Sequence, residues 1–139
     1  MKEVGPNAFR DCKRLKSVQL NEGLERLGAK EVIDGRRCEG RVFCGAAIES
    51  IRIPSTVRKL EAETFRSCES LRRVEIPSGV ECIGEQCFCE SGVEEVILPA
   101  TLREIGEDVF EDCKSLKTVW AEEGCKIDIK ALVDENVTV

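Results

Sequence analysis

Phenylalanine recurs along the chain at a nearly constant interval. The last four of the five phenylalanines are separated by 22, 23 and 22 residues. Each phenylalanine is followed, 8 or 9 residues later, by two apolar residues with one residue between them. The phenylalanines are Phe9, Phe43, Phe65, Phe88 and Phe110, and the apolar pairs are Val18/Leu20, Ile51/Ile53, Val74/Ile76, Val96/Leu98 and Val119/Ala121. A constant period of this length predicts a repeat architecture.

The third repeat shows how the pattern builds a strand. Leu71, Val74 and Ile76 follow an L-x-x-L-x-L spacing. Because Val74 and Ile76 alternate with Glu75, they predict a short strand with one face inward and one face in solvent. Pro77 ends the predicted strand, since proline has no N–H with which to continue a hydrogen-bonded ladder.

The residues after this strand predict the return of the chain. Val80 and Ile83 are expected to run along the opposite side of the coil. Gly84 is expected to provide a turn with positive φ, which glycine adopts without steric cost. A single coil of this kind cannot enclose its own apolar side chains, so each coil needs neighbours on which to stack.

Written as one motif, the repeat is I-G-x-x-x-F-x-x-C-x-x-L-x-x-V-x-I-P-x-x-V, and its instances cover residues 4 to about 125. This motif resembles the BspA-like class of leucine-rich repeats. The resemblance implies a curved solenoid with a parallel strand ladder on its concave face, used for adhesion and protein recognition, often in surface proteins. The expected fold class is therefore an α/β-type repeat solenoid, a leucine-rich repeat of about five coils of 22–23 residues.

The spacing also predicts the domain organisation, a single leucine-rich-repeat domain over residues 1–139. The interval from Phe9 to Phe43 is 34 residues, about 11 more than one period, which predicts an insertion. Insertions in solenoids are expected as surface loops. The tail has an alternating apolar pattern and is expected to form a C-terminal cap containing a strand. The predicted boundaries are repeats at about 4–27, 42–59, 60–82, 83–104 and 105–125, an insertion at about 28–41 and a cap at 126–139.

Composition and charge narrow the range of partners. Asp and Glu outnumber Lys and Arg by 27 to 21, giving a net charge of −6, and an acidic surface repels the phosphates of nucleic acid. No apolar run approaches the roughly 18 residues of a membrane-spanning helix, and the first residues do not resemble a secretory signal. We therefore expect a protein or peptide partner, with no nucleic acid and no membrane insertion.

The cysteines are expected to be structural. The chain has nine cysteines, an odd number, and no histidine. Cys12, Cys68 and Cys113 share one position, three residues after a phenylalanine, where small buried thiols are expected. Reduced thiols are favoured over a disulfide scaffold, because the chain is long enough to fold without crosslinks. Reduced cysteines favour an intracellular setting, whereas the family resemblance allows the cell surface, and both alternatives stay open.

Catalytic chemistry has little support in the sequence. Without histidine, no cysteine has the usual base that would activate it as a nucleophile. The cysteine spacings do not match those of structural zinc sites, and no glycine-rich loop is present to hold a phosphate. We predict no catalytic residues, no bound metal and no cofactor, and keep a thiol-based redox protein as a remote alternative.

The outward positions of the predicted strands are the candidate binding site. Their central column changes from polar at Gln19 to apolar at Ile97 and Trp120. One interpretation is a ladder of weak surface ion pairs between neighbouring strands. The other is an interface with an apolar centre and a charged rim, provided that the C-terminal cap does not cover Trp120. The candidate protein-binding residues are Arg52, Arg72, Arg73, Glu75, Glu94, Glu95, Ile97 and Trp120.

Two functions remain at this point. The leading prediction is a non-enzymatic module for protein recognition or adhesion that presents the repeat surface to its ligand. The alternative is a structural spacer, a segment that only extends a larger repeat array.

Overall fold

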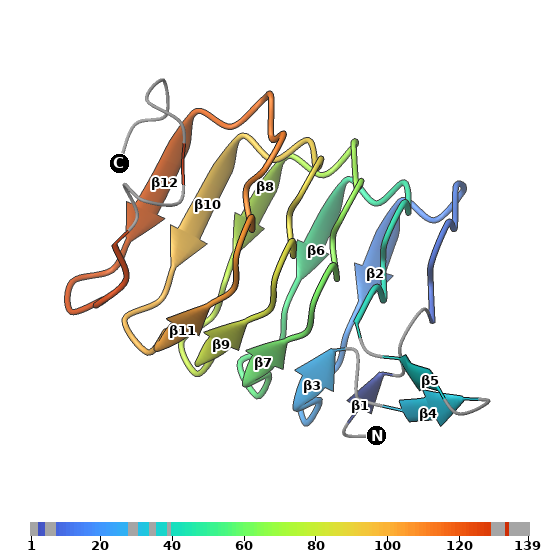
Figure 1. The fold of residues 1–139 in the computed structure, drawn as a ribbon, viewed down its shortest axis with the longest axis horizontal. Helices are drawn as coiled ribbons and strands as arrows, with labels where there is room; N and C mark the ends of the chain where they lie inside the picture. Colours follow the sequence, from blue (N-terminus) through green and yellow to red (C-terminus); the bar gives the residue numbers. More distant parts are fainter. Residues whose placement is uncertain are drawn as a thin grey trace.

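The structure, a computed structural model, describes residues 3–4, 8–27, 31–33, 36–38, 40–128 and 133, and gives only the backbone of residues 3–4, 31–33 and 36–38. Two parallel ladders of strands run along the molecule (Figure 1). We call them the long-strand ladder and the short-strand ladder. The long-strand ladder has the order β12-β10-β8-β6-β2, and the short-strand ladder has the order β1-β3-β7-β9-β11.

The strands of each ladder hold the same position in successive coils, numbered 1 to 5 after the five phenylalanines. The long strands are β2 (Ser17–Gln19), β6 (Ser50–Arg52), β8 (Arg73–Glu75), β10 (Glu95–Leu98) and β12 (Thr118–Ala121). The short strands are β1 (Glu3–Val4), β3 (Arg26–Leu27), β7 (Lys59–Leu60), β9 (Cys82–Ile83) and β11 (Glu104–Ile105). The predicted repeat solenoid and its parallel ladder are confirmed.

The predicted α/β-type character needs correction, because no residue in the described part of the chain is helical. The segment that carries each phenylalanine forms turns instead. In coil 3 the residues two before and two after the phenylalanine, Glu63 and Ser67, have φ values of 57° and 59°. An α-helix needs φ near −60°, so two left-handed residues within five exclude one.

These left-handed residues build a third set of hydrogen bonds between coils, which we call the turn ladder. In coil 3 the N–H of Glu63 donates to the carbonyl of Glu85 at 2.9 Å, and the N–H of Phe65 donates to the carbonyl of Cys87 at 2.8 Å. The N–H of Ser67 donates to the carbonyl of Cys89 at 2.9 Å. Equivalent bonds join coils 1, 2 and 4 to the coil that follows each. Every turn-ladder bond therefore points in one direction along the molecule.

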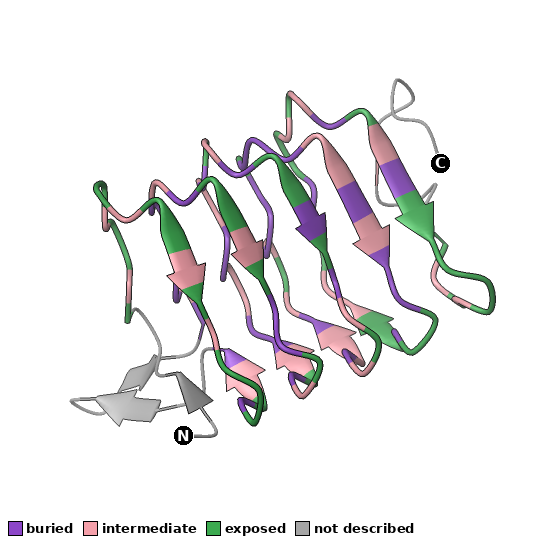
Figure 2. Ribbon diagram, turned by 180° about the vertical axis from the view of Figure 1, so that it is seen from behind, coloured by how far each residue is buried: buried purple, intermediate pink, exposed green. Residues whose placement is uncertain are grey.

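The core lies inside the coils, between the two ladders and the turns. Figure 2 shows buried residues following the inner side of successive coils. The five phenylalanine rings stack in one column, with centroids 5.3–5.9 Å apart and planes within 9° of parallel. Phe43, Phe65 and Phe88 are fully buried, whereas Phe9 in the first coil is half-buried. The rings of Phe43, Phe65 and Phe88 thus each have a neighbouring ring on both faces.

Gly84 has a different role from the one predicted. It does not have positive φ. A Cβ placed on it would lie 2.4 Å from the backbone nitrogen of Ala62 in the preceding coil, and one on Gly106 would lie 2.3 Å from that of Glu85. Close approach to the preceding coil, rather than a turn, therefore requires glycine at Gly84 and at Gly106.

The insertion and the tail lie at opposite ends of the array. Within the insertion, predicted as a loop, β4 (Glu31–Ile33) and β5 (Arg36–Cys38) pair as an antiparallel two-stranded sheet. Residues 28–30, 34, 35 and 39 lie outside the described residues, as does most of the predicted cap with its strand. In the described part of the tail, Ile127 and Val133 pack against the core.

Loss of a stacked phenylalanine should destabilise the whole array. We expect Phe65→Ala to lower the free energy of unfolding by about 3–5 kcal/mol, because it leaves a cavity between two covered rings. Arg52→Ala, an exposed change in the same array, should cost about 0.5 kcal/mol or less. Chemical denaturation of both variants checks this, and equal small losses would show that the repeat register is wrong.

A methyl group at the tight approach between coils should also be costly. We expect Gly84→Ala to cost about 3 kcal/mol, since it meets backbone that cannot move aside. The matched control is Gly23→Ala, where φ is +103° and the added Cβ enters open space. That variant should cost about 1 kcal/mol from backbone strain alone. Thermal melts that gave equal losses would mean that the coils separate readily.

Candidate functional site

The outward column of the long-strand ladder brings the two predicted apolar residues together. In the parallel register, Trp120 of β12 pairs with Ile97 of β10, and Ile97 pairs with Glu75 of β8. Trp120 is 55% exposed and is the one large apolar side chain of the described residues that is exposed. Ile97 is half-buried. The apolar end of the column is therefore open to solvent at Trp120.

The charged candidates surround this column but form few contacts with one another. The Arg73 Nε and Glu95 Oε2 atoms lie 3.8 Å apart across neighbouring strands, with both side chains largely exposed. Arg72 Nη1 donates to the carbonyl of Gly92 at 3.2 Å. Arg52, Glu75 and Glu94 form no ion pair with another described residue. Because an exposed pair at this distance stabilises a fold by only about 0–1 kcal/mol, these charges contribute little to the array.

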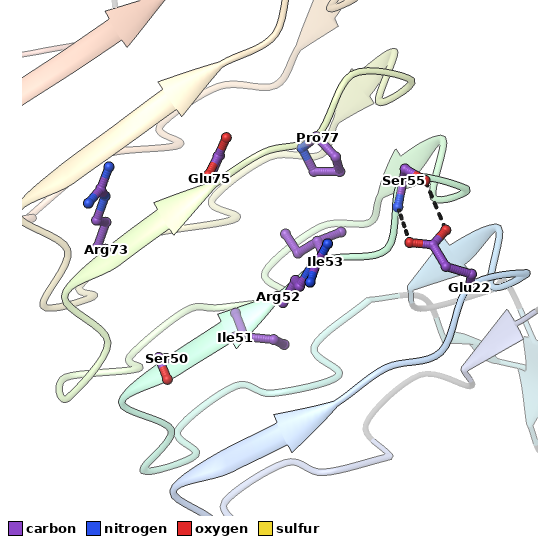
Figure 3. A pocket seen from close by; sticks show the side chains of 9 residues that line it. All are labelled: Glu22, Ser50, Ile51, Arg52, Ile53, Ser55, Arg73, Glu75 and Pro77. Atoms are coloured by element: carbon purple, nitrogen blue, oxygen red, sulfur yellow. Dashed lines mark hydrogen bonds between the residues drawn. The ribbon is translucent and has the colours of Figure 1, made fainter.

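A groove of about 610 Å³ lies over β6 and β8 (Figure 3). It brings together three of the predicted residues, Arg52, Arg73 and Glu75. Arg72, Glu94, Glu95, Ile97 and Trp120 do not line it. The remaining lining residues are Glu22, Ser50, Ile51, Ile53, Ser55 and Pro77.

Sequence reasoning missed Glu22 and Ser55, which close one end of the groove. The Glu22 carboxylate accepts hydrogen bonds from the Ser55 hydroxyl at 2.9 Å and from its backbone N–H at 3.2 Å. The hydroxyl bond first, and then the backbone bond, lower the pKa of Glu22. Both residues stand two positions after the second residue of an apolar pair, Leu20 and Ile53, in adjacent coils. That shared repeat position was the available signal.

A second charged cluster lies on the turn ladder, away from the groove. Glu63 accepts from Arg41 at 2.9 and 3.1 Å and from Arg66 at 3.2 Å. Partial burial alone would raise the pKa of Glu63, but the two guanidinium groups outweigh it and hold the pKa below its ordinary value. Arg41 and Glu63 belong to adjacent coils, so the cluster joins coils 2 and 3.

The described thiols have the environment of structural cysteines. Burial raises the pKa of Cys68 and of Cys87 to about 12, and that of Cys89 to about 11. The Cys68 thiol donates to the carbonyl of Phe43 at 3.0 Å, and the Cys113 thiol donates to Phe88 at 2.9 Å. In the described part of the chain, no three His, Cys, Asp or Glu residues are grouped so that they could hold a metal ion. Cys68 and Cys113, each three residues after a phenylalanine, thus form a hydrogen bond with the preceding coil.

The repeat geometry has a match among known families. A sequence model of the BspA type leucine rich repeat region matches six copies over residues 1–31 and 37–137. The chain belongs to the BspA-type leucine-rich-repeat family. The family model counts six copies, one more than the roughly five coils predicted from the phenylalanines. Proteins of this family generally mediate protein interactions and are generally not enzymes.

Solved structures of bacterial leucine-rich-repeat proteins are similar to this BspA-type chain. One from Eubacterium ventriosum has a TM-score of 0.77 at 18% identity, over 90% of this chain and 30% of its own. The Treponema pallidum leucine-rich-repeat protein has a TM-score of 0.75 at 28% identity, over 85% of this chain and 51% of its own. The pneumococcal vaccine antigen PcpA has a TM-score of 0.71 at 20% identity, over 98% of this chain and 33% of its own. The chain thus spans between about a third and a half of their lengths.

No curated protein matches the chain. Among the described residues, no helix is long and apolar enough to cross a membrane.

The raised thiol pKa values predict low reactivity in the folded protein. At about pH 8 we expect a thiol reagent to label a minority of the nine cysteines until denaturant is added, because buried thiols stay protonated. The stability that Cys68 and Cys87 contribute through these shifts should be present below about pH 8.5, and should be lost as the pH rises toward 12. Rapid labelling of most cysteines without unfolding would contradict the structural role.

Proposed function

We propose that this BspA-type chain is a non-enzymatic recognition module that binds protein through its long-strand ladder. Ile97 and Trp120 form the apolar centre of the binding surface. The rim consists of the charged residues Arg52, Arg72, Arg73, Glu75, Glu94 and Glu95.

The exposure of Trp120 carries this proposal. A tryptophan that is 55% exposed on a short strand leaves much of its ring in water, which the fold alone does not require. Tryptophan and arginine are the residues that most often dominate binding energy at protein interfaces, where an apolar centre is surrounded by a polar rim. The groove beside Arg52 adds a concave feature next to this centre.

A structural spacer is the competing function. In a spacer, the stacked coils only extend a larger array, and the outward residues have no ligand. The two functions differ in what happens when an outward residue is removed, because a spacer loses nothing except stability.

Trp120→Ala separates the two functions. We expect its unfolding free energy to change by about 0.5 kcal/mol or less, while binding weakens by about 2 kcal/mol, or roughly thirtyfold. Thermal denaturation measures the first quantity. Quantitative capture from an extract of the native cell, with wild-type and variant protein immobilised in parallel, measures the second.

Glu104→Ala, an exposed change on the short-strand ladder, is the matched control and should capture the same proteins as the wild type. A Trp120→Ala variant that melted earlier but captured an unchanged set of proteins would refute the recognition surface. Such a result would mean that Trp120 packs against the tail.

A further inference from the structure

The residues that precede the long strands alternate strictly in charge. From coil 1 to coil 5 this row, which we call the alternating row, is Lys16, Glu49, Arg72, Glu94 and Lys117. Backbone hydrogen bonds hold its members in register. The N–H of Glu49 donates to the carbonyl of Lys16 at 2.8 Å, and the N–H of Glu94 donates to the carbonyl of Arg72 at 2.7 Å. No member forms an ion pair with a described residue, and four of the five are exposed.

An alternating row is complementary to a reversed copy of itself. Neighbouring strands lie about 4.8 Å apart, so the sign of the charge changes with every step of that length. If a second row runs in the opposite direction, displaced so that odd-numbered coils face even-numbered ones, every cation meets a carboxylate. Such an arrangement is generated by a two-fold axis parallel to the strands.

We propose that the long-strand ladder binds a second copy of this chain about such an axis, with coils 2, 3, 4 and 5 facing coils 5, 4, 3 and 2. This inference rests on the proposed function, because it names the partner of the same surface. Glu49 then faces the second copy's Lys117, and Arg72 faces its Glu94. Within the strands, Arg73 faces Glu95 of the other copy.

The same arrangement covers the exposed tryptophan. Trp120 of coil 5 faces Arg52 of coil 2, which lines the 610 Å³ groove. An arginine over an indole face is a favourable cation–π pair, and Arg52 is among the side chains that line the groove (Figure 3). Ile97 faces the methylene stem of Glu75. Because the two-fold axis repeats each contact, both tryptophans become covered.

Other two-fold arrangements of the same face are less favourable. Moving the axis onto coil 3 places Glu49 against Glu94 and Arg72 against its own copy. An axis along the ladder places Arg73 on Arg73 and Glu95 on Glu95. Like charges in contact cost free energy, so these alternatives are disfavoured. Displacing the reversed copy by two further coils keeps the charges complementary, but in one direction it leaves Trp120 uncovered, and in the other direction it leaves only coils 4 and 5 in contact.

The size of the face sets the expected strength of the dimer. The four facing strands span about 14 Å along the ladder, and each is only 3 or 4 residues long. This area is small compared with the roughly 800 Å² per partner of a stable complex. We therefore expect a weak, salt-sensitive dimer, with a dissociation constant of about 10 µM or more.

Charge reversals on Glu49 and Lys117 test the proposal. These residues lie in coils 2 and 5, so they cannot pair within one chain. Sedimentation equilibrium from about 1 µM to about 1 mM should show a monomer–dimer equilibrium for the wild type. Glu49→Lys alone and Lys117→Glu alone should each weaken it by about tenfold or more. An equimolar mixture of the two variants should regain the dimer, because each reversed charge then meets its opposite.

Two further variants complete the experiment. Trp120→Ala should weaken the dimer, and Glu104→Lys, a charge reversal on the short-strand ladder, should leave it unchanged. A wild-type chain that stays monomeric to about 1 mM would overturn the dimer. A dimer whose affinity is unchanged by either charge reversal would also overturn the proposal. So would an equimolar mixture of the two variants that fails to dimerise. A monomer whose Trp120→Ala variant still loses a captured protein would leave the recognition function standing with a different partner.

Discussion

The structure depends on backbone hydrogen bonds that must meet the next coil at three places. The long strands, the short strands and the turn ladder each bond coil to coil, so a change of path length at one place displaces the other two. This constraint explains why the period stays at 22 or 23 residues. It also explains why the 34-residue interval is accommodated by a separate two-stranded sheet, β4 and β5, rather than by a wider coil.

The sequence predicted the coils wherever apolar side chains recur at fixed positions. It failed where the structure depends on the conformation or the close approach of the backbone. The phenylalanine column and the alternating pairs such as Val74 and Ile76 identified the coils, because burial selects apolar side chains at fixed positions. Residue type does not reveal the left-handed φ of Glu63 and Ser67, so the α/β-type character of the predicted solenoid needed correction. Gly84 was assigned to a turn, since sequence does not distinguish a glycine needed for conformation from one needed for close approach.

The alternation of inward and outward side chains along the strands also made part of the candidate surface predictable. Arg52, Arg73 and Glu75 are outward by strand alternation alone, and they share one groove. Glu22 reaches that groove from a turn, where alternation has no meaning. Stability lies inside the coils and in the backbone bonds between them, whereas the outward side chains make few contacts. The outward face can therefore vary to suit a ligand with little effect on folding.

The single direction of the turn ladder has an electrostatic consequence. Three peptide units per coil are aligned, each with its carbonyl toward the first coil and its N–H toward the last, so their dipoles add as they do in a helix. The positive pole lies at coil 5 and the negative pole at coil 1. Coil 5 carries four exposed acids around its phenylalanine, Glu107, Asp108, Glu111 and Asp112, and coil 1 carries the bases Arg10, Lys13 and Arg14. The array thus has a macrodipole although none of its described residues is helical, and its terminal charges oppose that dipole.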